Sequence, residues 1–122
     1  MQQTDTHGRT EPDIGLREAQ AAVDRWITTV GVRYFSPLTN MAILAEETGE
    51  VARVIARCDG EQSAKPGEKL DLADELADLL WVTLAIANQH GIDMARAFAN
   101  NIVKKNVRDG ERHKLNSKLQ DN

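Results

Sequence analysis

The chain has 122 residues, of which 41% are hydrophobic, 28% charged and only 4% aromatic. This length and composition suit one soluble globular domain, and the shortage of aromatic residues beside abundant Ala and Leu favours packed helices over a sheet. A formal net charge of −4 argues against a nucleic-acid-binding surface, and no run of about 20 apolar residues predicts a membrane span.

The cysteine content and the N-terminal residues indicate the cellular compartment in which the protein is expected. Cys58 is the only cysteine, so no disulfide can form within the chain and a reducing environment is expected. Residues 1–13 are polar and lack the apolar core of a signal peptide. We therefore expect a cytoplasmic protein with a flexible leader over residues 1–13, a helical domain over 14–110 and a polar tail over 111–122.

A first helix is predicted from about residue 14 to 32, because apolar residues recur there in steps of three and four. The connector that follows, 33–40, contains Ser36-Pro37, which disfavours helix at Ser36, and Thr39 or Asn40 is expected to cap the next helix. The aromatic side chains in this connector either line a pocket or pack against the hydrophobic core.

The second predicted helix spans about 40–58 and carries acids on its apolar side. At about 100° per residue, Glu47 lies near the middle of the apolar arc, Glu50 lies at its edge, and Glu46 points toward Arg53. A charged carboxylate that is buried without a partner is strongly unfavourable. Glu47 is therefore expected to have a cationic partner that Glu50, one turn away, can share.

The third predicted helix, from about 68 to 89, follows a Gly- and Pro-containing loop and carries an acidic stripe. Asp71 and Asp74 lie near its start, where acids suit the helix dipole, but Glu75 and Asp78 lie deeper, where that effect has faded. The rest of the circumference is apolar nearly all round. Such a helix is expected in the interior, either in the core or at a subunit interface.

The fourth predicted helix spans about 92–107 and has an apolar stripe that ends in basic and amide side chains. Two interpretations of that end remain open. Cations at a helix C-terminus are favoured by the dipole, or these side chains face the acids across a bundle and bind an anionic ligand.

The second and third helices can pair as an antiparallel hairpin, which would bring together four oxygen ligands: Glu47, Glu50, Glu75 and Asp78. All-oxygen ligation indicates Mg²⁺, or Mn²⁺ in its place. A di-iron site of the helical carboxylate type needs His three residues after Glu, and none stands there. A phosphate reaction with a metal-activated water is the chemistry that these residues favour.

The same residues resemble a known family. Glu-Glu-Thr-Gly-Glu, followed by Asp-Glu-Leu-Ala-Asp-Leu-Leu-Trp, is similar to the Glu-x-x-Glu and Glu-x-x-Asp signature of MazG-type nucleotide pyrophosphohydrolases. Phe-Ser-Pro-Leu-Thr-Asn before the first pair and Gly-Ile-Asp after the second agree with it. The resemblance covers about residues 16–108, and its signature falls on the four acids named above.

The resemblance implies an all-α, four-helix bundle-like domain completed as a homodimer or homotetramer. It also implies Mg²⁺-dependent hydrolysis of a nucleoside triphosphate to monophosphate and pyrophosphate, by water attack on the α-phosphorus, in nucleotide-pool house-cleaning. Glu47 or Glu50 would then activate the water. The matching substrate-binding candidates are Asn40, Lys105, Asn106 and Arg108, with Phe35 and Trp26 against the base. One departure is Ile102, which stands where members often carry Lys.

Other functions remain open at this point. The closest enzymatic alternative is hydrolysis of phosphoribosyl-ATP, which uses a similar scaffold. A non-catalytic nucleotide-binding helical dimer and a purely structural acidic helix are the alternatives outside catalysis. The identity of the base does not follow from the sequence.

Overall fold

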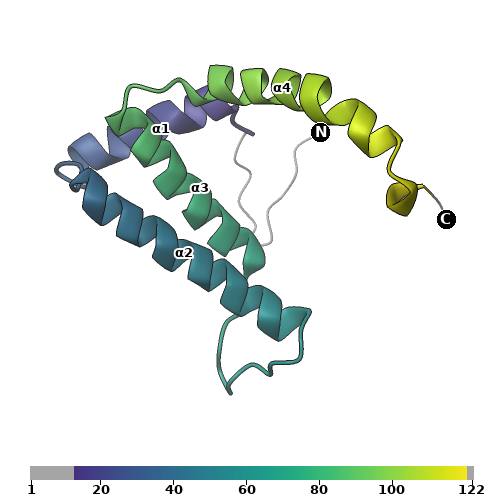
Figure 1. The fold of residues 1–122 in the computed structure, drawn as a ribbon. Helices are drawn as coiled ribbons and strands as arrows, with labels where there is room; N and C mark the ends of the chain where they lie inside the picture. Colours follow the sequence, from purple (N-terminus) through teal and green to yellow (C-terminus); the bar gives the residue numbers. More distant parts are fainter. Residues whose placement is uncertain (1–12, 121–122) are drawn as a thin grey trace.

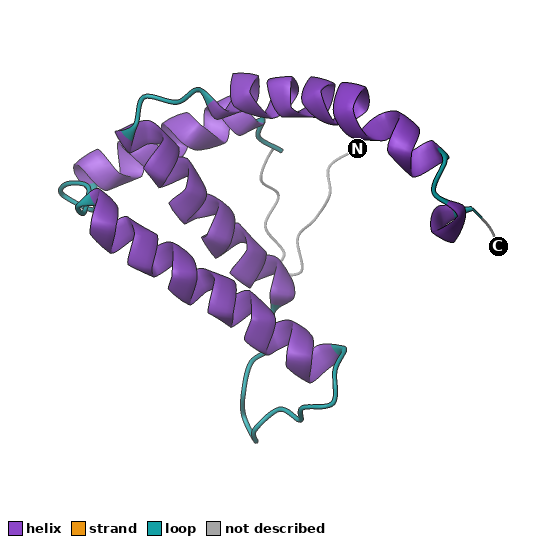
Figure 2. Ribbon diagram, viewed as in Figure 1, coloured by secondary structure: helices purple, strands orange, loops and turns teal. Residues whose placement is uncertain are grey.

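The computed structural model describes residues 13–120 of the chain. They form four α-helices, α1 (Leu16–Thr29), α2 (Pro37–Cys58), α3 (Leu72–Gln89) and α4 (Met94–Lys114), and a short 3₁₀-helix, η1 (Ser117–Leu119). Within this range no strand is present (Figure 2), so the all-α prediction is confirmed. Apart from its last residue, the predicted leader 1–13 lies outside the described residues.

The helices α2 and α3 form an antiparallel hairpin, and α1 packs across α3 (Figure 1). The shared core is small, since Val23 and Ile27 of α1 meet Leu84 and Ala85 of α3. Val54 of α2 is fully buried. None of the helices in the described part of the chain is long and apolar enough to cross a membrane.

The start of α2 differs from the sequence-based expectation. Ser36 is the N-cap, its side chain accepting a hydrogen bond from the backbone N–H of Thr39, and Pro37 begins the helix. The prediction of a cap at Thr39 or Asn40 is therefore wrong. The physical reason is that the first helical position needs no N–H donor and suits the fixed φ of proline, so Ser36-Pro37 starts a helix rather than delaying it.

Aspartates cap the next two helices, and α3 begins at Leu72, later than the predicted start near residue 68. Asp71 caps α3 by accepting from the backbone N–H of Asp74, and Asp93 caps α4 by accepting from Ala95 and Arg96. Between these helices Gly91 adopts a positive φ of 65°, which costs glycine little. The short turn therefore holds the end of α3 beside the start of α4.

The fourth helix leaves the other three instead of closing a bundle within the chain. It contacts α1 near its start and then extends away from the α2–α3 hairpin (Figure 1). It also continues through Asp109 to Lys114, where Asp109 pairs with Arg108 and Arg112. Its predicted apolar stripe stays exposed, with Phe98 among the exposed side chains.

The apolar surface of α3 is only partly covered. Leu76, Leu80 and Trp81 are 48%, 47% and 39% exposed. Of the two expected settings for α3, the core of this chain accounts for only part of the helix, because α1 and α2 cover only part of its circumference. Burial at a subunit interface stays a prediction.

Candidate active site

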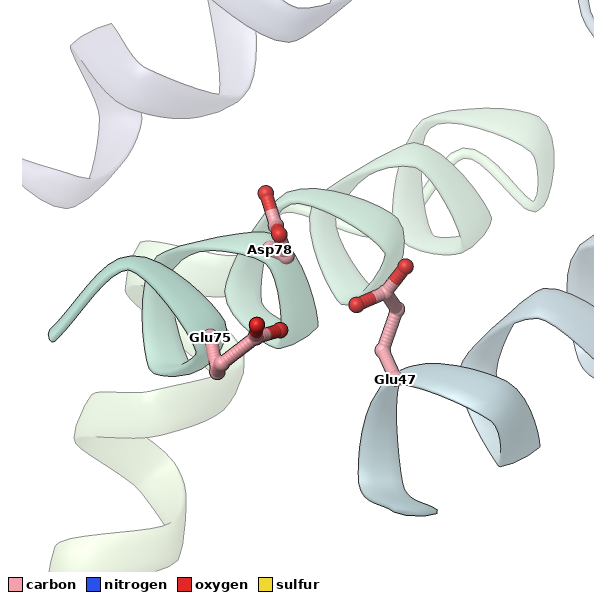
Figure 3. A group of neighbouring side chains, drawn as sticks. All are labelled: Glu47, Glu75 and Asp78. Carbon is pink, nitrogen blue, oxygen red and sulfur yellow. The ribbon is translucent and has the colours of Figure 1, made fainter. Parts of the chain in front are cut away.

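The α2–α3 hairpin brings together three of the four predicted metal ligands. Glu47 comes from α2, and Glu75 and Asp78 come from α3, one turn apart. One carboxylate oxygen from each lies within 4.8 Å of the others, and Figure 3 shows Glu47 reaching from α2 toward the helix that carries Glu75 and Asp78. The i, i+3 spacing on α3 places both of its acids on the side that meets α2.

The fourth predicted ligand, Glu50, is turned toward an arginine. Arg53 Nε lies 3.0 Å from Glu50 Oε2, and the same guanidinium lies 3.1 Å from Glu68 and 3.7 Å from Glu75. Arg57 also pairs with Glu68, at 3.3 Å. The sequence did not single out Glu68, which was expected at the start of the third helix and lies instead in the loop before it.

The three grouped acids all have raised pKa values. Burial is the largest cause for each, and the neighbouring carboxylates add to it: Asp78, Glu75 and Glu50 act on Glu47, while Asp74 acts on Asp78. For Glu75, burial and the charges of Glu50 and Asp78 outweigh the opposing effect of Arg53. The protein thus holds negative charges close together at some electrostatic cost.

The burial expected for these acids is only partly present. Glu47 and Glu75 are half-buried and Asp78 is exposed, because α4 extends away from the hairpin instead of covering it. Among the described residues, no Lys or Arg forms an ion pair with Glu47 or Asp78. A cluster in which two of three carboxylates lack a cationic partner suits a hard divalent cation with oxygen ligands, so the residues present fit a cation of the Mg²⁺ type.

A cavity of about 380 Å³ opens beside this acid cluster. Glu47 and Asp78 belong to both the cluster and the cavity wall, and Trp26, Phe35 and Trp81 supply aromatic surface. The rings of Trp26 and Trp81 meet edge to face, with centroids 5.6 Å apart. Trp26 is 48% exposed, so it forms cavity wall and is not a core residue.

Side chains that form hydrogen bonds also line this cavity, together with its aromatic residues. Tyr34 donates a hydrogen bond from its hydroxyl to Asp24 at 2.5 Å. Burial, together with that carboxylate, raises the pKa of Tyr34 to about 12, so the hydroxyl keeps its proton at neutral pH. Asn40, a predicted substrate residue, is buried and lines the cavity. The sequence did not single out Trp81, whose apolar context marked it only as a packing residue.

The basic and amide candidates on the last helix lie elsewhere. Lys105, Asn106 and Arg108 are exposed on the half of α4 that extends away from the hairpin (Figure 1). Arg108 pairs with its neighbour Asp109 at 3.1 Å. Within one chain the structure does not bring these three residues to the acids.

Acids grouped beside an aromatic cavity, on an all-α scaffold, define a helical protein with a candidate active site. The sequence profile of the MazG nucleotide pyrophosphohydrolase domain matches residues 35–113. The chain belongs to the MazG nucleotide pyrophosphohydrolase family, and it is a hydrolase.

Relatives in Bacillus support this membership. The YpjD protein of Bacillus subtilis strain 168 is 38% identical over 101 residues, which are 82% of this chain and 91% of YpjD. A crystal structure of the Bacillus subtilis protein YPJD is 37% identical, with a TM-score of 0.69 over 81% of this chain and 100% of that one. The crystal structure of the Bacillus-conserved MazG protein, a nucleotide pyrophosphohydrolase, is 33% identical, with a TM-score of 0.66 over 83% and 99%.

Proposed function

We propose that this chain hydrolyses nucleoside triphosphates to monophosphates and pyrophosphate with Mg²⁺, as a house-cleaning enzyme of the nucleotide pool. The observation that carries the proposal is that Glu47 and Asp78 belong both to the acid cluster and to the wall of the aromatic cavity. A nucleotide has the same two parts, a flat base and a charged phosphate chain. A base in the cavity would place its phosphates beside the acids.

Each part of the site has a role in this reaction. Glu47, Glu75 and Asp78 would hold Mg²⁺, or Mn²⁺ in its place. When bound, the metal ion would neutralise phosphate charge and lower the pKa of a water molecule. Glu50, which stands outside the three-residue cluster but one turn from Glu47, would accept the proton of the attacking water. Trp26, Phe35 and Asn40 would contact the base.

We also propose that the chain assembles as a homodimer or homotetramer in the cytoplasm. Exposed apolar side chains on α3 and α4, among them Leu80 and Phe98, support a second copy packing on these helices. The α4 of that copy could bring Lys105, Asn106 and Arg108 to the phosphates. The lone free thiol of Cys58 suits a reducing compartment. Light scattering after size-exclusion chromatography measures the assembly, and a monomer at micromolar concentration would refute it.

The test of the activity is pyrophosphate release from a panel of canonical and modified nucleoside triphosphates, with Mg²⁺ and Mn²⁺ separately. Phosphoribosyl-ATP belongs in the panel, since its preferential hydrolysis would favour the related enzymatic alternative. Glu47→Gln and Asp78→Asn should each abolish release while circular dichroism stays helical. Glu46→Gln is the matched control, because Glu46 is exposed on the same turn of α2 and lies outside the cluster. Full turnover in both cluster variants would refute the proposal.

A further inference from the structure

Two side-chain amides form a relay at the wall of the cavity. Asn40 lies in the first turns of α2 and is 5% exposed. Its Nδ2 donates a hydrogen bond to Gln89 Oε1 at 2.9 Å, and Gln89 Nε2 donates to the backbone carbonyl of Phe35 at 2.6 Å. The relay therefore joins the start of α2, the end of α3 and the connector before α2.

The backbone carbonyl sets the direction of both amides. The oxygen and nitrogen ends of an amide have nearly the same shape, so their partners decide the orientation. The carbonyl of Phe35 can only accept a hydrogen bond, which requires Gln89 to turn its Nε2 toward it. Gln89 Oε1 then faces Asn40, so Asn40 must present its donor Nδ2 to this oxygen. A 180° turn of either amide would oppose two acceptors or two donors.

The relay leaves the oxygen end of Asn40 for a ligand. Within residues 13–120, Asn40 Oδ1 has no hydrogen-bond partner. Asn40 lines the cavity, whose acids Glu47 and Asp78 also present acceptors when ionised. Because Gln89 engages Nδ2, Oδ1 is the end of the Asn40 amide that is left to accept a hydrogen bond from a ligand in the cavity.

We infer that Gln89 is a positioning residue that fixes Asn40 as a hydrogen-bond acceptor, so that the cavity selects bases presenting an amino or imino N–H to it. This inference rests on the proposed function, because it takes the cavity to be the base site. A base that turned a ring nitrogen or a carbonyl toward Asn40 Oδ1 would oppose two acceptors and leave both unpaired. Gln89 itself acts through Asn40.

The experiment compares each base with an analogue that lacks the N–H. Suitable pairs of triphosphates are cytosine with pyrimidin-2-one, adenine with purine, and uracil with 3-methyluracil, chosen for the base that wild type hydrolyses fastest. The ratio of kcat/KM within the pair is measured for wild type, Gln89→Met and Gln89→Glu. Gln62→Met, the same change at an exposed loop position, is the matched control.

Wild type and Gln62→Met should favour the N–H base by about 10-fold or more. Gln89→Met frees the Asn40 amide to turn, so its ratio should fall toward one. Gln89→Glu loses the hydrogen bond to the Phe35 carbonyl, but its carboxylate still accepts from Asn40 Nδ2, so it should keep the preference wherever the variant folds. Equal use of both analogues by wild type, or an unchanged ratio in folded Gln89→Met, would overturn the inference. The wild-type comparison holds even if a variant fails to fold.

The two proposals fail in different ways. If wild type releases no pyrophosphate from any triphosphate, the proposed function is refuted, and the same pairs are then compared by nucleotide-induced thermal stabilisation. A preference for the N–H base in binding would still support the role of Asn40 and Gln89. Binding without preference, or no binding, would overturn this inference as well.

Discussion

Neutralising Glu47 should stabilise the metal-free protein, although it removes a residue of the proposed active site. Burial and the charges of Asp78 and Glu75 raise the pKa of the Glu47 carboxyl. The ionised form is therefore less favourable in the folded chain than in the unfolded one. Glu47→Gln keeps the shape of the side chain and removes the charge, so it relieves this repulsion.

The size of the effect follows from the spacing of the carboxylates. Two unit charges at the 4.8 Å upper limit of this spacing repel by about 1 kcal/mol at the dielectric constant of water and by about 3.5 kcal/mol at an effective value near 20. Glu47 is half-buried and Asp78 is exposed, so solvent screening favours the lower figure. We expect Glu47→Gln to raise the free energy of unfolding by about 1 kcal/mol, or the melting temperature by about 4 °C.

Metal should reverse the order of stability. At a free Mg²⁺ concentration of about 100 times its Kd, binding to the folded state alone adds about 2.7 kcal/mol, and Glu47→Gln should forfeit most of that gain. Thermal unfolding followed by circular dichroism, in EDTA and in Mg²⁺, measures both effects, with Glu46→Gln as the control. The reasoning is refuted if Glu47→Gln melts below wild type in EDTA, or if Glu46→Gln gives the same increase.

Three further predictions concern the cluster and the helix junctions. In metal-free buffer, the advantage of Glu47→Gln over wild type should vanish near about pH 3, where the carboxyl is protonated in both states. It should grow as pH rises through the raised pKa, and urea titrations at a series of pH values measure it. Arg53→Met removes the cation beside Glu50, so we expect lower stability in EDTA but a larger Mg²⁺-induced increase in melting temperature. An unchanged increase would count against competition between Arg53 and the metal. Gln20→Leu should lower the free energy of unfolding by about 1–3 kcal/mol, measured in urea. In wild type the Ile92 backbone carbonyl accepts a hydrogen bond from Gln20 Nε2 at 2.6 Å, and the substitution removes this donor.

Local sequence determined much of what could be predicted. The helices follow from apolar steps of three and four, and the acid Asp71 stands at the start of α3, near where the sequence places it, because such preferences depend on a few neighbouring residues. The one-turn spacing of Glu75 and Asp78 places both on the same side of α3. That spacing is a property of the helix itself, so it required no knowledge of the tertiary contacts.

The sequence did not predict which side chains, distant along the chain, would pair with each other. The spacing of Glu50 suits a metal shared with Glu47 and also an ion pair with Arg53 one turn on. Glu68 helps to decide between these outcomes, because it holds the same guanidinium from the loop. The position of a loop side chain depends on the closure of the loop, which helix periodicity does not determine. The amide relay has the same origin, since Asn40 and Gln89 are 49 residues apart.

The exposed apolar surfaces and the acid cluster lead to one physical expectation about the chain. A single copy leaves Leu80 and Phe98 in water, and it holds the carboxylates of Glu47 and Asp78 within 4.8 Å of each other. Both features lower the stability of the isolated, metal-free chain. Burial of apolar surface against a second copy would remove the first cost, and a divalent cation would remove the second. Assembly and metal binding should therefore each raise the melting temperature. If α4 of one copy reaches the acids of another, the two gains should also be coupled, with each larger in the presence of the other.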